Sequence, residues 1–252
     1  MRTRFHQLLY FGLGLSLAFV PDHAVLPQEN AGVARPATSE IIQRLVAENE
    51  RRSQQLGAYT SRRHYHVAYR GFPHAAEADM TVDAICSGSN SKRFDVVSES
   101  GSHVLLDHAL KRLLRAEQDD SHHRSESALT PKNYTFSLLR TELDNGRRFY
   151  VLAVEPKQSR ALLYRGTIWV DAQDYAVVKL IAEPARNPSF WIRDTQIDRE
   201  YEKTGDLWLP RSDRSETKVR LGGTAVLTIE YDDYRFGDGT GNSSADPQAA
   251  AR

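Results

Sequence analysis

Over most of the chain, apolar and polar residues alternate, and this period of two predicts β-strands. Tyr65, Val67 and Tyr69 form the first such run, flanked by histidine and arginine. Two more runs span Ala78–Cys86 and Lys92–Val97, separated by a Ser-Gly-Ser-Asn sequence that is typical of a hairpin turn. We therefore expect three strands in this part of the chain, the last two joined as a hairpin.

The second half of the chain has the pattern of a long antiparallel meander. Asn145-Gly146 is its strongest turn signal, because both residues tolerate positive φ, and Gly222-Gly223 marks another tight turn. Connections this short can join only antiparallel neighbours. The expected strands are Tyr134–Glu142, Arg148–Val154, Ala161–Asp171, Tyr175–Ala182, Phe190–Tyr201, Leu207–Val219 and Ala225–Phe236.

Two segments repeat apolar residues at helical spacing instead. Ser39–Gln55 is one predicted helix, and Ser102–Glu117 is the other. Two helices are few for a sheet of about ten strands, so an uncovered part of its apolar face would form a groove. The alternative is a sheet that curls onto itself. The apolar positions of the second helix are Val104, Leu105, Ala109, Leu113 and Leu114.

The N-terminus has the order of a secretory signal. Arg2 and Arg4 precede an uncharged apolar run, Leu8–Val20, which is shorter than a membrane span. A cleaved signal peptide and export to the periplasm are expected, with an uncleaved N-terminal anchor as the alternative. The chain then divides into a signal peptide (1–24), a flexible spacer (25–38), a mainly β domain (39–236) and a disordered tail (237–252).

The charge balance and the cysteine content exclude some classes of function and some kinds of stabilisation. The 33 Lys and Arg residues balance 33 Asp and Glu residues, which argues against nucleic-acid binding. The pairs Arg51-Arg52, Arg62-Arg63 and Arg147-Arg148 are interpreted as solvated. The single cysteine, Cys86, cannot form an internal disulfide and is expected to be buried and inert.

The sequence offers no catalytic constellation. It has no G-x-S-x-G elbow, no glycine-rich phosphate loop and no H-E-x-x-H motif. His64 and His66 share one strand face and His122-His123 follow in a polar segment, but this spacing is not a zinc signature. We therefore predict a protein that is not an enzyme and that has no cofactor and no metal.

Four short motifs carry a family resemblance: Gly166–Asp171, Asp174–Lys179, Leu207–Pro210 and Ile229–Tyr234. Together with the N-terminal helix, they resemble the LolA-like superfamily of outer-membrane lipoprotein carriers, in its divergent bacterial branches. The resemblance implies a curved antiparallel half-barrel of about ten strands with helices over its concave face. In that family the concave apolar surface holds lipoprotein acyl chains, and related members sense lipids or misfolded envelope proteins.

The resulting hypothesis is a periplasmic binding or carrier protein for lipid or lipoprotein acyl chains. An envelope sensor that acts on a membrane protein partner is the alternative, and an envelope hydrolase is a third reading. The segments Leu105–Leu114 and Asp119–Thr130 are a candidate lid. The residues expected to line the groove are Tyr65, Val67, Tyr69, Trp169, Trp191, Trp208, Leu227, Ile229 and Tyr231.

Overall fold

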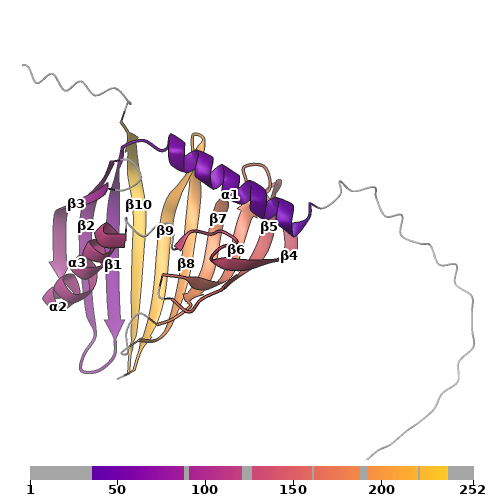
Figure 1. Cartoon of the computed structure of the whole chain (residues 1–252). Coiled ribbons are helices and arrows are strands. Elements are labelled where there is room, and N and C mark those ends of the chain that lie inside the picture. Colours follow the sequence, from indigo (N-terminus) through magenta and orange to yellow (C-terminus); the bar gives the residue numbers. More distant parts are fainter. Residues whose placement is uncertain are drawn as a thin grey trace, which may run out of the picture. The chain divides into compact units, whose positions relative to one another are not determined.

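The computed structural model describes residues 36–87, 91–120, 127–160, 162–187, 192–220 and 222–237, and Figure 1 shows their arrangement. Within these residues, ten strands form one antiparallel sheet. The helical segments are α1 (Thr38–Gln55), α2 (His103–Leu105), the π-helical turn η1 (Leu106–Leu110) and α3 (Lys111–Asp120). The strands are β1 (Tyr59–Arg70), β2 (Ala76–Ser87), β3 (Ser91–Gly101), β4 (Tyr134–Asp144), β5 (Arg147–Pro156), β6 (Tyr164–Asp171), β7 (Val177–Pro184), β8 (Ile192–Thr204), β9 (Leu207–Val219) and β10 (Thr224–Phe236).

The strand order follows from two meanders that meet at β1 and β10. The order is β3-β2-β1-β10-β9-β8-β7-β6-β5-β4, so β3 and β4 form the two free edges of an open sheet. The connection from β3 to β4 carries α2, η1 and α3. The predicted fold, an open antiparallel sheet of about ten strands with helices on one face, is confirmed.

The tight turns have the predicted chemistry. Asn145 and Gly146 have φ of 48° and 77°, the positive values that a type I′ hairpin turn requires. Gly222 and Gly223, between β9 and β10, have φ of 93° and 119°. Both turns join antiparallel neighbours, as their short lengths dictate.

The register places one row of side chains on the same face across the sheet, because direct cross-strand partners share a face. Both ends of the row are apolar and buried, whereas its centre on β8 and β9 is charged. From β5 to β2, the row is Leu152, Ile168, Leu180, Arg199, Asp213, Ile229, Tyr65 and Met80. We call the side of the sheet that carries this row the helix-bearing face.

Both predicted helices form, and three of the apolar positions expected in the second, Leu105, Leu113 and Leu114, pack against the sheet. Leu106 and Leu110, which are not among the expected positions, are buried together with Leu114, and the segment includes the π-helical turn η1. Val104, predicted to be an apolar contact, is 66% exposed. Cys86 is buried as expected, 2% exposed on the helix-bearing face.

Several predictions lie outside the described residues. These are the signal peptide, most of the spacer, the Ser-Gly-Ser-Asn turn, Trp191, His122-His123, and all but the first residue of the tail. Among the described helices, none combines the length and the apolar composition needed to cross a membrane.

Candidate functional site

The first apolar cluster forms where α1 packs on the β4–β7 end of the sheet, and we call it the α1 cluster. Ile41 and Leu45 of α1 are fully buried against the sheet. Arg52, near the end of α1, donates to the carbonyl oxygens of Asp174 and Tyr175 at 2.8 and 3.0 Å. These bonds fix the helix to the β6–β7 turn. The sheet contributes Tyr134, Tyr150, Leu152, Val154, Ile168, Val170, Leu180 and Ala182 to this cluster.

The second apolar cluster, the α3 cluster, lies at the other end of the same face. Leu106, Leu110 and Leu114 pack against β1, β2 and β10. In Figure 1 the α2–α3 segment lies beside β1–β3, whereas α1 runs from beside β4 and β5 toward the tops of β8 and β9. The sheet contributes Tyr65, Val67, Ala78, Met80, Val82 and Ile229 to this cluster.

The strip between the clusters, on β8 and β9, is only partly covered. Within the described residues, neither cluster draws a buried member from these two strands. Ile197 is partly buried on the helix-bearing face, beside the hydroxyls of Thr195 and Thr217, which lie 3.1 Å apart. The face therefore offers two apolar regions separated by a more polar strip.

A charged pair marks the centre of this strip. Arg199 donates to Asp213 through Nε at 2.8 Å and also through Nη2. Burial alone would lower the pKa of Arg199, but Tyr201 and Asp213 beside it raise that pKa overall. The guanidinium therefore stays charged between the two apolar clusters.

A second set of charges is buried under α3. Arg63 of β1 is 3% exposed, and its Nη1 lies 3.0 Å from both carboxylate oxygens of Glu117. Lys92 of β3 donates to the same carboxylate at 2.7 Å. Burial alone would raise the pKa of Glu117, but the two cations hold it below its ordinary value. Glu117 therefore fixes α3 to two strands while remaining ionised.

The prediction that the arginine pairs are solvated is wrong for Arg63. Arg62 is solvent-accessible and pairs with Asp83 on the opposite face, whereas Arg63 points under α3. Arg52 is also largely buried, with 11% of its side chain exposed. Adjacent residues in a strand point to opposite faces, so an arginine pair in a strand cannot be solvated as a unit when one face is covered.

The predicted groove residues separate into four groups. Tyr65, Val67, Tyr69, Leu227, Ile229 and Tyr231 all lie on the helix-bearing face, as register partners or next-but-one neighbours on β1 and β10. Trp169 lies on the opposite face, where its indole donates to Glu142 at 2.8 Å. Trp208 donates to Asp174 at 2.9 Å, at the β6–β7 turn. Trp191 is outside the described residues, and the role of the others in ligand binding stays a prediction.

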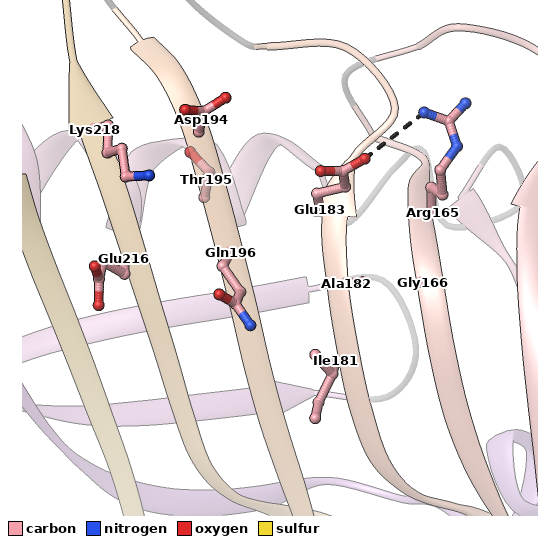
Figure 2. Close-up of a pocket in the computed structure, with 10 residues that line it drawn as sticks. All are labelled: Arg165, Gly166, Ile181, Ala182, Glu183, Asp194, Thr195, Gln196, Glu216 and Lys218. Carbon is pink, nitrogen blue, oxygen red and sulfur yellow. Dashed lines mark ion pairs between the residues drawn. The ribbon is translucent and has the colours of Figure 1, made fainter. Parts of the chain in front are cut away.

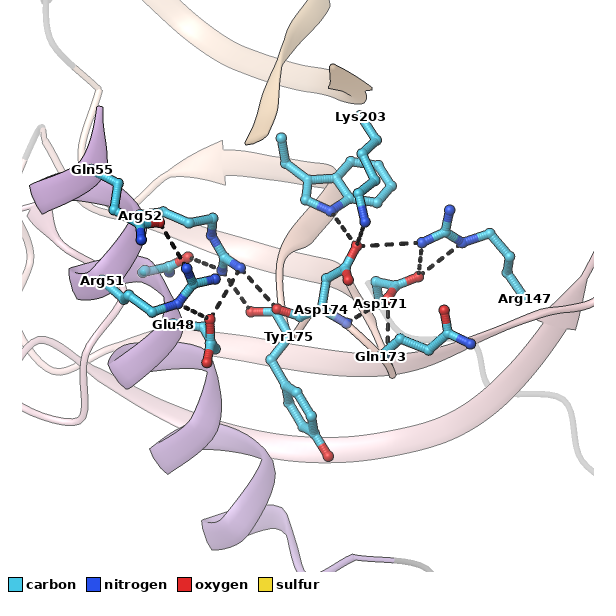
Figure 3. Close-up of polar contacts among 12 residues, drawn as sticks. Glu48, Arg51, Arg52, Gln55, Arg147, Asp171, Gln173, Asp174, Tyr175 and Lys203 are labelled. Atoms are coloured by element: carbon cyan, nitrogen blue, oxygen red, sulfur yellow. Dashed lines mark hydrogen bonds and ion pairs between the residues drawn. The ribbon is translucent and has the colours of Figure 1, made fainter. Parts of the chain in front are cut away.

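A polar network surrounds the β6–β7 turn and the end of α1 (Figure 3). Asp171 is 1% exposed and accepts from Arg147 at 2.8 Å and from the backbone of the turn that follows it. Asp174 accepts from Lys203 at 2.7 Å. Burial alone would raise the pKa of Asp174, but Lys203 and Trp208 lower it overall. The resemblance motifs around this turn therefore have a structural role that the sequence alone did not indicate.

A cavity of about 420 Å³ opens where β7 and β8 separate (Figure 2). The two strands pair only from Lys179 with Glu200 to Ala182 with Ile197. Beyond this point the cavity is lined largely by polar side chains of both charges. An acyl chain would leave these groups without water, so the cavity is better suited to solvent.

His64 and His66, the histidines of the sequence analysis that lie in the described part of the chain, have acidic partners on the sheet surface. His64 and His66 are on the opposite face, where they contact Asp232 at 3.3 Å and Asp79 at 2.8 Å. The described residues contain no group of three or more His, Cys, Asp or Glu side chains that could hold a metal ion. These histidines therefore have ordinary surface partners.

The chain is similar to a protein family and to several solved structures. Residues 126–232 match a family of unknown function, DUF5686, and no curated protein matches the chain. The chain is similar to a domain described as an outer membrane lipoprotein-sorting protein from Vibrio parahaemolyticus, with 12% identity and a TM-score of 0.43, over 81% of this chain and 95% of that chain.

Two further solved structures are similar. A LolA superfamily protein from Nitrosomonas europaea has 12% identity and a TM-score of 0.34, over 81% of this chain and 95% of that chain. The MucA/MucB complex of Pseudomonas aeruginosa has 11% identity and a TM-score of 0.25, over 79% and 99%. The fold of this chain is established by its own strand order and register.

Proposed function

We propose that the protein is an exported binding or carrier protein that holds a hydrophobic ligand, lipid or lipoprotein acyl chains, on its helix-bearing face. The observation that carries this proposal is the division of that face into two apolar clusters, one packed against α1 and the other against the α2–α3 segment, with no buried cluster member on β8 or β9 among the described residues. The strip on β8 and β9 gives a ligand access to both clusters. Export and a place in the cell envelope rest on the N-terminal sequence pattern.

The two faces of the sheet differ in the way this proposal requires. On the opposite face, Lys179 pairs with Glu200 at 2.9 Å and lies 3.6 Å from Asp198. Arg214 and Glu216 add a further exposed pair at 3.2 Å. A hydrophobic ligand would have to desolvate these charges, so the helix-bearing face is its natural site.

On binding, the ligand would replace apolar contacts between the helices and the sheet with its own contacts to the sheet. Burying an acyl chain contributes about 0.8 kcal/mol per methylene, and no charged recognition is needed for that part of the affinity. Leu106, Leu110 and Leu114 now fill the β1–β2 end of the face. A ligand that takes their place moves the helices outward, and their return favours release.

The test is a titration with a fluorescent fatty acid, using two matched variants of β8. Ile197→Asp puts a charge on the helix-bearing face and should weaken binding about tenfold or more. Gln196→Asp places the same side chain on the opposite face, where Gln196 is exposed, and should leave binding unchanged. Absence of binding by the wild-type protein, or equal effects of the two variants, would overturn the proposal.

A further inference from the structure

Three successive inward positions of β1 carry buried groups whose donor hydrogens have no acceptor among the described residues. They are the hydroxyl of Ser61, Nε of Arg63 and the hydroxyl of Tyr65, in residues that are 2%, 3% and 1% exposed. The Tyr65 hydroxyl interacts with the side chain of Arg63, which is itself a donor. All three groups can donate a hydrogen bond. Buried donors without acceptors are costly to a folded protein, so their repetition along one strand calls for an explanation.

The surroundings of these donors carry an excess of positive charge. Arg63 and Lys92 share the single carboxylate of Glu117, so this group of three has a net charge of +1. Arg199 and Asp213, which lie on the far side of Tyr231 from this group, neutralise each other. Unpaired donors and surplus positive charge together are suited to an acceptor that is also an anion.

Apolar side chains adjoin the charged group. The guanidinium of Arg63 lies between the rings of Phe94 and Tyr231, at 5.2 and 5.1 Å from their centroids. Phe94 and Tyr231 also pack against the α3 cluster, next to Leu114. An amphiphile could therefore place its chain in this cluster and its charged end beside Arg63.

We propose that Arg63 and Lys92, with the hydroxyl of Tyr65, form a headgroup site for an amphiphile with a phosphate monoester or carboxylate group. The ligand's anionic oxygens replace the carboxylate of Glu117, which occupies the site from α3 in this structure. The inference rests on the proposed function, because it names the chemical class of the same ligand. Nε of Arg63, which Glu117 leaves unpaired, gains an acceptor in the exchange.

The test compares two lipids that differ only in the phosphate, 1-oleoylglycerol 3-phosphate and 1-oleoylglycerol, by displacement of a fluorescent fatty acid. Wild-type protein should bind the phosphate form about tenfold more tightly. Arg63→Gln and Lys92→Gln should each reduce this preference. Glu117→Gln removes the internal competitor and should strengthen binding of the phosphate form more than binding of 1-oleoylglycerol, so the preference for the phosphate form should increase.

Arg62→Gln is the matched control, since Arg62 lies next to Arg63 but pairs with Asp83 on the opposite face. Thermal unfolding followed by circular dichroism checks that each variant folds, and Lys92→Gln decides the outcome should Arg63→Gln not fold. Equal wild-type affinity for the two lipids would overturn the headgroup site while leaving the proposed function intact. Binding of neither lipid would overturn both, and equally tight binding of inorganic phosphate alone would indicate a free-anion site instead.

Discussion

At the scale of single residues, Arg62 and Arg63 show how one strand serves two environments. Arg62 and Asp83 form a pair with 40% of each side chain exposed, so water screens their attraction. Arg63 has 4% of its side chain exposed and contacts Glu117 and two aromatic rings. The same residue type is therefore a surface group at one position and part of the interior at the next.

We expect Arg63→Met to lower the free energy of unfolding by about 3 kcal/mol or more, because the change leaves the largely buried carboxylate of Glu117 with Lys92 alone. Arg62→Met removes an exposed pair and should change stability little. Urea unfolding of the two variants and the wild type measures both effects. Equal losses in the two variants would contradict the assignment of Arg63 to the interior.

The pKa of Glu117 leads to a pH-dependent prediction. Because this pKa is held below its ordinary value of 4.5 in the folded protein, folding favours the ionised carboxylate. The resulting stability is present above the unfolded-state pKa and is lost as the pH falls through the folded-state value. The stability difference between wild type and Glu117→Gln should therefore be largest at neutral pH and shrink below about pH 4. Urea unfolding of both proteins at a series of pH values measures this difference. A difference that does not change with pH would contradict the prediction.

The burial of Arg63 could have been inferred from the sequence, because this residue is in phase with Tyr65 and Val67. The identity of its partner, Glu117, could not have been inferred. Glu117 is 54 residues away, on a helix whose position depends on tertiary packing. Arg199 and Asp213 were missed for a related reason: they become direct partners only through the register of β8 and β9, which includes a bulge beyond Glu200.

At the scale of elements, strands and turns followed from local sequence, whereas the exact face of the second helix did not. Asn145-Gly146 determines its own hairpin by backbone preference alone. The buried leucines of the second helix, Leu106, Leu110 and Leu114, have ordinary helical spacing, but the π-helical turn η1 in this segment was not predicted. Close approaches between strands are equally invisible, and Gly166 of β6 is the clearest example.

A Cβ at Gly166 would lie 2.2 Å from the carbonyl oxygen of Ile181 and 2.6 Å from Cα of Ala182 on β7. Gly166→Ala should therefore push the two strands apart and lower the free energy of unfolding by about 1–3 kcal/mol. Gly57→Ala is the control, since nothing lies within 4 Å of its added Cβ. Thermal unfolding compares them, and an unaffected Gly166→Ala variant would show that β6 and β7 are not packed this closely.

At the scale of the whole domain, one continuous sheet has a face with many exposed ion pairs and a helix-bearing face with two apolar clusters and a charged strip between them. Its topology brings β1 beside β10, so that Tyr65 and Ile229, far apart in sequence, become direct partners. The number of strands and their antiparallel pairing could be predicted from turn spacing. The pairing of β1 with β10 could not be predicted, nor could the charged strip between the two clusters. Both depend on contacts between segments that are distant in sequence.

Photo-crosslinking with a diazirine fatty acid can show whether a hydrophobic ligand occupies the helix-bearing face. After irradiation, mass spectrometry of peptides locates the attached lipid. We predict adducts on inward residues such as Ile197 and Leu227, and none on their outward neighbours Gln196 and Thr228. Adducts confined to the outward residues, or no more labelling than in the urea-unfolded chain, would contradict the account.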